Sequence, residues 1–200
     1  MRRIAAVAAL MLGFIGAVVL HTPLASASTT TVCDGDISYT TLASVFVPSG
    51  ADCVLDHVTV KGDVRAQDAQ NLDIFNSTVK GTVDIAGSRG SNHSFEVCNS
   101  TIGRDVRVAN LAGSDSFELE GDTNESCGKV NVAGSVRLST NQGDVEVSWT
   151  KIGADLSAVG NGDVEFEHNN VGADRRCSDN GHLDITDEPD TVHGRDLCTS

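Results

Sequence analysis

The chain has 200 residues, a formal net charge of −14 and only 4% aromatic residues. So acidic a protein repels phosphate backbones, which excludes nucleic acid as a main partner, and the composition excludes a large aromatic core. Hydrophobic residues still make up 40% of the chain, with 20 glycines and three prolines. This composition favours an ordered fold built on small and β-branched residues over disorder.

Residues 1–27 have the pattern of a secretory signal peptide. Two arginines form a positive start, an apolar run follows, and Ala25-Ser26-Ala27 supplies small residues at a cleavage site. A membrane anchor is the alternative, but the apolar run is at the short limit for spanning a bilayer. The sequence therefore predicts a secreted, extracellular protein with one mature domain over 28–200 and no membrane span after cleavage.

An internal repeat organises the mature chain. A strand-like triplet of apolar, acidic and apolar residues recurs at steps of 23, 22, 28, 19 and 19 residues. The copies are Leu72-Asp73-Ile74, Phe95-Glu96-Val97, Phe117-Glu118-Leu119, Val145-Glu146-Val147, Val164-Glu165-Phe166 and Leu183-Asp184-Ile185. A second motif places a glycine between two apolar residues, as in Val79-Lys80-Gly81-Thr82-Val83. Turn segments such as Asn161-Gly162-Asp163 separate the copies and terminate the strands.

These period-two segments predict very short strands, and the mature chain has no helical periodicity long enough for a helix. A three-residue strand cannot bury one face alone, whereas the same triplet stacked coil upon coil forms a parallel sheet over a narrow aliphatic interior. We therefore predict an all-β fold, a right-handed parallel β-helix (β-solenoid) of about seven to eight short coils. The uneven steps disfavour a left-handed hexapeptide helix, and a β-sandwich is the alternative.

The repeat resembles that of secreted right-handed parallel β-helix proteins, the architecture shared by pectate lyase-like enzymes and many non-enzymatic repeat proteins. It is more loosely similar to bactofilin scaffolds, which are cytoplasmic and are not built around cysteine pairs. The resemblance covers roughly Val45 to Cys198 and consists of the repeat pattern. No catalytic motif accompanies it, so it implies a fold and carries over no functional residue.

All six cysteines lie in the mature chain, and an even number in an oxidising compartment indicates disulfides. Their spacing does not match a zinc ribbon. Two pairs are separated by 20 and 21 residues, about one coil, so each can staple neighbouring coils near one end. Of the remaining two, Cys127 lies in the insert over 121–129 that lengthens one step to 28 residues, and its bridge to Cys98 should pin that insert to the coil below. We predict the disulfides Cys33–Cys53, Cys98–Cys127 and Cys177–Cys198.

The middle residue of each triplet should face solvent, because side chains alternate along a strand. Stacked about 4.8 Å apart, these residues form a column of carboxylates: Asp73, Glu96, Glu118, Glu146, Glu165 and Asp184. A second outward column is mostly basic: Arg65, Asp84, Arg107, Arg137, Ser157 and Arg176. The favoured interpretation is that charge keeps exposed strands soluble and that the two columns partly offset each other. The alternative is a site for calcium or for a cationic surface, such as a polyamine or an amino-sugar polymer.

No metal, cofactor or catalytic set is predicted. The chain has no HExxH, no GxSxG and no phosphate-binding loop. We interpret the mature histidines as solvated turn residues: His57, His93, His168, His182 and His193. A C-terminal acidic group lacks the spacing of a calcium-binding EF-hand and is interpreted as a solvated loop: Asp184, Asp187, Glu188 and Asp190.

The sequence therefore predicts a non-catalytic structural or binding module at or outside the cell surface, whose partner is a cell-envelope or extracellular polymer. The alternative is a calcium-dependent polysaccharide lyase or hydrolase of β-helix architecture with an arginine base. The short coils argue against that enzyme, because long loops are needed to wall a substrate groove. An ice-binding solenoid would need regular outward Thr-x-Thr pairs on a flat face, and we expect that Thr78 and Thr101 do not continue into such a ladder.

Overall fold

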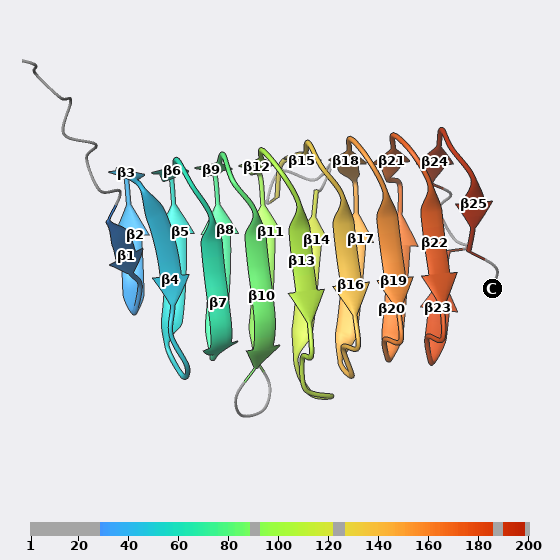
Figure 1. Cartoon of the computed structure of the whole chain (residues 1–200), viewed down its shortest axis with the longest axis horizontal. Coiled ribbons are helices and arrows are strands. Elements are labelled where there is room, and N and C mark those ends of the chain that lie inside the picture. The colour runs from blue at the N-terminus through green and yellow to red at the C-terminus, as the bar shows by residue number, and fades with distance from the viewer. Residues whose placement is uncertain (1–28, 89–92, 122–126, 186–189, 199–200) are drawn as a thin grey trace, which may run out of the picture.

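The computed structural model describes residues 29–88, 93–121, 127–185 and 190–198, and the expected signal peptide lies outside these ranges. The described residues form an all-β parallel solenoid of about eight coils and contain no helix (Figure 1). The predicted β-solenoid is confirmed, and a β-sandwich is excluded because consecutive coils pair in parallel. In Figure 1 the front strands run downward and the rear strands upward as the chain advances to the right, which is a right-handed winding.

Each coil contributes strands to three sheets, which we call sheets A, B and C. Sheet A contains β1 (Thr30–Val32), β4 (Ser44–Val47), β7 (Val64–Ala69), β10 (Val83–Ser88), β13 (Val106–Ala109), β16 (Val136–Ser139), β19 (Leu156–Val159), β22 (Arg175–Ser178) and β25 (Asp196–Leu197). Sheet B contains β2 (Gly35–Ser38), β5 (Asp52–Asp56), β8 (Asn71–Phe75), β11 (Ser94–Cys98), β14 (Ser116–Glu120), β17 (Asp144–Ser148), β20 (Asp163–Glu167) and β23 (His182–Asp184). Sheet C contains β3 (Thr41–Leu42), β6 (Thr59–Val60), β9 (Thr78–Val79), β12 (Thr101–Ile102), β15 (Val130–Val132), β18 (Thr150–Ile152), β21 (Asn170–Val171) and β24 (Thr191–Val192).

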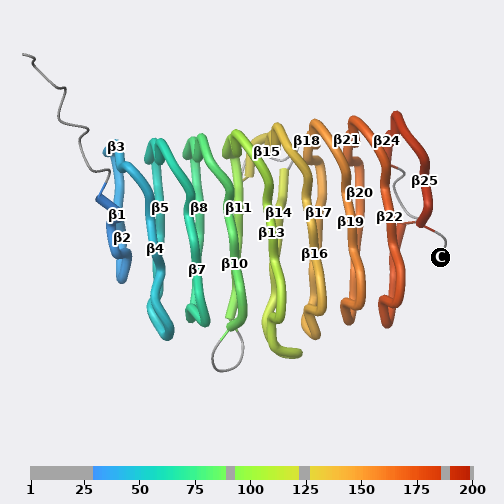
Figure 2. Tube along the Cα trace, viewed as in Figure 1, coloured from blue at the N-terminus to red at the C-terminus, as the bar shows by residue number. Residues whose placement is uncertain are grey.

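The repeated triplets lie along six of the eight strands of sheet B, β8 to β23, and they pair in the register that their spacing predicts. Phe95 of β11 lies beside Phe117 of β14, which in turn lies beside Val145 of β17. The flanking residues of the triplets point inward and form two files, both buried except in the last coil, where Leu183 and Ile185 are half-buried. The trace in Figure 2 shows the resulting coils stacked along one axis.

The glycine motif turns the chain from sheet C into sheet A. Val79 ends β9 and Val83 begins β10, with Gly81 in the turn between them. A glycine is needed at such turns because neighbouring coils approach very closely. A Cβ atom added to Gly103 would lie 2.5 Å from the carbonyl oxygen of Lys80 in the preceding coil.

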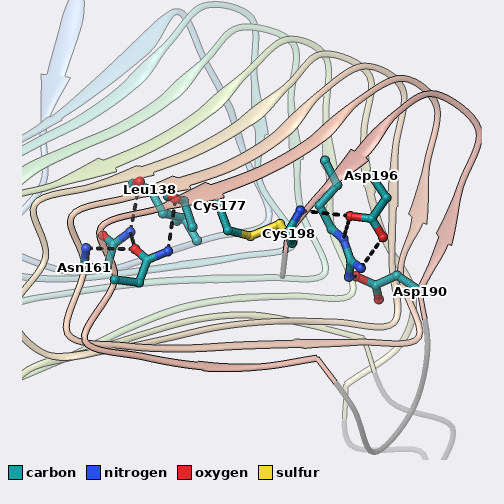
Figure 3. The surroundings of a disulfide bond; sticks show 9 residues. Leu138, Asn161, Cys177, Asp190, Asp196 and Cys198 are labelled. Atoms are coloured by element: carbon teal, nitrogen blue, oxygen red, sulfur yellow. Dashed lines mark hydrogen bonds and ion pairs between the residues drawn. A yellow bond between two sulfur atoms is a disulfide. The ribbon is translucent and has the colours of Figure 1, made fainter. Parts of the chain in front are cut away.

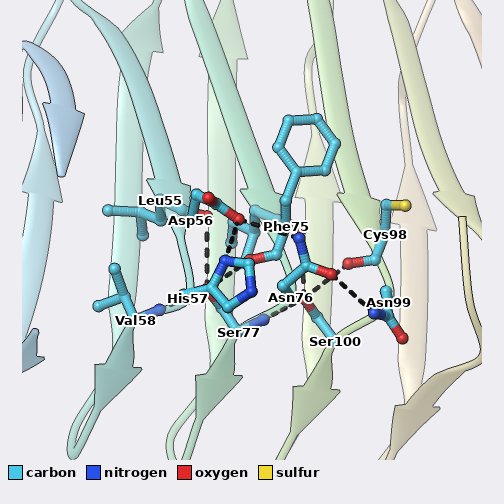
Figure 4. Close-up of polar contacts among 11 residues, drawn as sticks. Leu55, Asp56, His57, Val58, Phe75, Asn76, Ser77, Cys98, Asn99 and Ser100 are labelled. Atoms are coloured by element: carbon cyan, nitrogen blue, oxygen red, sulfur yellow. Dashed lines mark hydrogen bonds and ion pairs between the residues drawn. The ribbon is translucent and has the colours of Figure 1, made fainter. Parts of the chain in front are cut away.

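A single left-handed residue turns the chain from sheet B into sheet C. Asn76 and Asn99 occupy this corner with φ of 50° and 44°, and the Asn99 side-chain amide donates to Asn76 Oδ1 at 2.7 Å. Behind them, the Ser77 backbone N–H donates to the buried hydroxyl of Ser100 at 3.0 Å (Figure 4). Polar groups inside the corners are therefore satisfied by the equivalent residue of the next coil.

The three disulfides join the cysteines in the expected pairs. Cys177 and Cys198 lie in equivalent positions of neighbouring coils, since Arg176 pairs with Leu197. Cys33 and Cys53 are not in equivalent positions, because Gly35 is the register partner of Cys53. Cys33 instead lies between β1 and β2, so this bridge ties the turn of the first coil to β5 of sheet B.

Arg175 lies at the C-terminal end of a file of inward-facing aliphatic residues on sheet A. It occupies the inward position next to Leu156 and is only 5% exposed. Its guanidinium donates to Asp190 at 2.8 Å and to Asp196 at 2.6 Å, beside the Cys177–Cys198 disulfide (Figure 3). The Asp190 carboxylate is fully buried, so its assignment to a solvated loop is wrong. A buried ion pair thus closes the C-terminal end of the core.

The inward and outward assignments predict different responses to truncation. Phe117→Ala should lower the free energy of unfolding by about 3 to 5 kcal/mol, because it leaves a cavity between coils. Arg107→Ala removes an exposed ion pair and should change it by less than about 1 kcal/mol. Urea unfolding of the two variants measures the difference. Equal losses would contradict the assignment of faces.

The C-terminal disulfide should hold the last coil in place. Replacing Cys177 and Cys198 by serine should lower the free energy of unfolding by about 2 to 4 kcal/mol, because the unfolded chain regains the freedom of a closed loop. Hydrogen exchange should accelerate in β22 and β25 before the central coils. Peptide mapping of the unreduced protein provides the control, and a link from Cys177 to any cysteine other than Cys198 would contradict this pairing.

Candidate binding face of sheet B

The six acidic residues singled out from the sequence form one continuous column on the outside of sheet B. Glu96 pairs with Asp73 on one side and with Glu118 on the other, and the register continues through Glu146 and Glu165 to Asp184. All except the exposed Glu165 are half-buried between their neighbours. The structure therefore brings together residues that are up to 111 positions apart in the chain.

The carboxylates extend beyond this column. Asp144 and Asp163 stack two residues upstream of it, and Glu120 and Glu167 lie two residues downstream in their strands. The sequence interpretation missed these acids, although the same alternation that places the column also directs them outward. The described strands of sheet B contain no lysine and no arginine. We call this surface the acidic face.

Burial and neighbouring charges make four carboxyls of the column unusually weak acids. Burial, followed by the nearby charges of Asp52 and Glu118, raises the pKa of Asp73 to about 6. Burial also raises the pKa of Glu165 to about 7, with contributions from Glu167, Glu146 and Asp184. The pKa values of Glu96 and Glu146 are raised for the same reasons. The acidic face is therefore strained by its own charge at neutral pH.

A shallow depression of about 360 Å³ lies over four neighbouring strands of the acidic face. Its charged and polar lining comes from the column and from the row beside it: Ser116, Glu118, Asp144, Glu146, Asp163, Glu165, His182 and Asp184. With this lining, the depression can receive a cationic group.

The basic column lies on sheet A, on the opposite side of the solenoid (Figure 1). Arg107 and Arg137 both bind Asp105, at 2.8 Å and 2.9 Å, and Arg176 binds Asp174 at 2.8 Å. These partners belong to the turns that lead into sheet A. The expectation that the two columns offset each other is therefore wrong, because the arginines are neutralised locally and the core separates them from the acidic face.

Two further expectations are tested by the geometry. Among the described residues, one group of potential metal ligands clusters within 4.8 Å, namely Glu96, Cys98 and Cys127, but the disulfide removes its thiolates as ligands. Thr78 and Thr101 do not continue into Thr-x-Thr pairs, in agreement with the expectation from the sequence. Thr41, Thr59, Thr78 and Thr101 stack outward on sheet C, in a single row rather than in the paired rows of an ice-binding face.

Comparison of the chain with protein families, with curated proteins and with solved structures found no match. Among the described residues there is also no helix long and apolar enough to cross a membrane.

The acidic face predicts an inverted pH dependence of stability. Its carboxyls bind protons more tightly when folded, so their contribution is present below the unfolded pKa values of about 4 and is lost as pH rises through about 6 to 7. We expect the Tm to fall between about pH 5 and pH 8. The double variant Glu118→Gln/Glu146→Gln should flatten this slope and raise the Tm at the alkaline end.

A matched control places the same change in net charge elsewhere. Asp84 points outward from sheet A and Asp179 lies in an exposed turn. Asp84→Asn/Asp179→Asn should leave the slope unchanged. A Tm that rises with pH in the unmodified protein would contradict self-repulsion on the acidic face.

Proposed function

We propose that the protein is a secreted, non-catalytic module that presents the acidic face of sheet B to a cationic polymer at or outside the cell surface. The observation that carries this proposal is the continuous carboxylate column, which has no lysine or arginine on its own sheet. The arginines of sheet A show that this chain can neutralise its charges locally, and on sheet B it does not. A polycation would relieve the repulsion and gain charge-assisted hydrogen bonds.

Amino-sugar polymers are the best match to this surface. Successive carboxylates repeat at the spacing of neighbouring strands, about 4.8 Å, which is comparable to the length of one sugar in such a polymer. A rigid sheet holds the carboxylates in place, so little conformational entropy is lost on binding. The three disulfides are compatible with an extracellular setting, and they support the secretion that the leader sequence predicts.

The arrangement of charges argues against the polysaccharide lyase or hydrolase. The lyase needs an arginine base close to the carboxylates, whereas Arg107, Arg137 and Arg176 lie on the other side of the core and are bound to turn aspartates. The described coils also have short turns beside the acidic face. A binding role therefore accounts for more of the surface than catalysis does.

Calorimetric titration with a chitosan hexamer tests the proposal, with the neutral N-acetylated hexamer as the reference ligand. At about pH 6 the hexamer should bind, and its affinity should fall steeply as salt is added, because the interaction is between exposed charges. Glu118→Gln/Glu146→Gln should weaken binding about tenfold. Asp84→Asn/Asp179→Asn should leave it unchanged. Absence of binding, or equal binding of the neutral hexamer, would refute the proposed function.

A further inference from the structure

A second depression, of about 360 Å³, lies where sheets B and C meet. It spans three successive coils near the C-terminal half of the solenoid. Its lining combines aromatic, cationic and amide side chains: Trp149, His168, Lys129, Lys151, Asn131 and Asn170. This chemistry differs from that of the acidic face, and the sequence interpretation left all of these residues without a role or, for His168, as a solvated turn.

Two stacked rings form the floor of this corner. The rings of Trp149 and His168 lie 3.8 Å apart between centroids and within 20° of parallel. Both residues have left-handed backbones, with φ of 49° and 53°. The same left-handed conformation occurs at this corner at Asn76 and Asn99, so it positions the two rings and does not by itself mark the site. Both side chains are half-buried.

Polar groups line the depression from sheet C. Lys151 of β18 lies between Asn131 of β15 and Asn170 of β21 on the outer surface of the sheet. These three residues are exposed, as is Lys129 immediately before β15. Two ammonium groups and two carboxamides are therefore presented beside an aromatic surface, in a chain that is otherwise strongly acidic.

A second aromatic pair elsewhere in the solenoid shows which features are found only at the Trp149 corner. Tyr39 and His57 stack at the same corner near the N-terminal end, with centroids 4.8 Å apart. The residues two positions further on are Thr41 and Thr59, where the Trp149 pair has lysine and asparagine. Stacking is thus a property of the corner, whereas the lysines and amides belong to the Trp149 site.

We propose that this depression, called the Trp149 site, binds a carboxylated sugar unit of an acidic oligosaccharide. Pyranose rings present C–H groups that pack on aromatic faces, and an indole offers a large surface for them. Ammonium groups form charge-assisted hydrogen bonds with a carboxylate, and carboxamides both donate to and accept from hydroxyls. A nucleic acid strand suits the site less well, because its denser charge is repelled by the adjoining acidic face.

The experiment uses the only tryptophan of the chain as a reporter. Trigalacturonate should change the fluorescence of Trp149, and calorimetry should give the same affinity. Lys129→Gln/Lys151→Gln should weaken binding at least about tenfold, because both charge-assisted contacts are lost. The matched control is Lys61→Gln/Lys80→Gln, which removes two exposed lysines next to sheet C but outside the site, and it should bind normally.

Each other outcome overturns the proposal. If neither method detects binding of trigalacturonate at millimolar concentration, the site does not take acidic sugars. Equal weakening in the two lysine pairs would show only diffuse electrostatic attraction. Equal binding of neutral cellotriose would remove the role of the carboxylate, and tighter binding of an oligothymidylate would assign the site to nucleic acid. None of these results depends on the acidic face, so this proposal and the proposed function fail separately.

Discussion

In-register stacking of coils is the constraint on which the whole structure depends. Strands of neighbouring coils lie about 4.8 Å apart, so each side chain meets its own equivalent above and below. Aliphatic residues satisfy this rule by forming files. Buried polar residues satisfy it by forming ladders, as where the side-chain amide of Asn141 donates to Asn161 Oδ1 at 2.9 Å and that of Asn161 donates to Asn180 Oδ1 at 3.0 Å. An amide suits this role because it is both donor and acceptor.

Charged residues are the one class that this rule penalises, since like charges are brought together. Sheet A resolves the conflict through its turns. The Asp105 carboxylate accepts from the Ser135 backbone N–H with one oxygen and from Arg107 and Arg137 with the other. The Asp105 carboxylate therefore satisfies a backbone N–H of the turn and neutralises two arginines of the column at the same time. The described strands of sheet B contain no lysine or arginine to play this part, and burial together with neighbouring carboxylates raises the pKa values of Asp73 and Glu165.

The sequence predicts what repeats and misses what occurs once. The triplets establish the register of sheet B because every copy keeps the same order of apolar, acidic and apolar residues, even where an insert lengthens the step between two copies. The first coil escaped detection because Gly35-Asp36-Ile37 lacks the first apolar residue. Arg175 was missed because a single cation inside a file has no periodic signal, and only the structure shows that Asp190 and Asp196 reach it. The Trp149 site was missed because nothing in the spacing reveals a left-handed corner.

That corner also explains how the acidic face and the basic Trp149 site coexist on one small solenoid. Glu167 ends β20 on the acidic face, the next residue is the left-handed His168, and Asn170 already points outward from sheet C. One residue with positive φ therefore redirects the chain so that adjacent side chains face different surroundings. The acidic face and the Trp149 site share three coils, so separation along the solenoid does not keep them apart. The change of direction at the corner does, and the chemistry on each side of it can differ without a change in the fold.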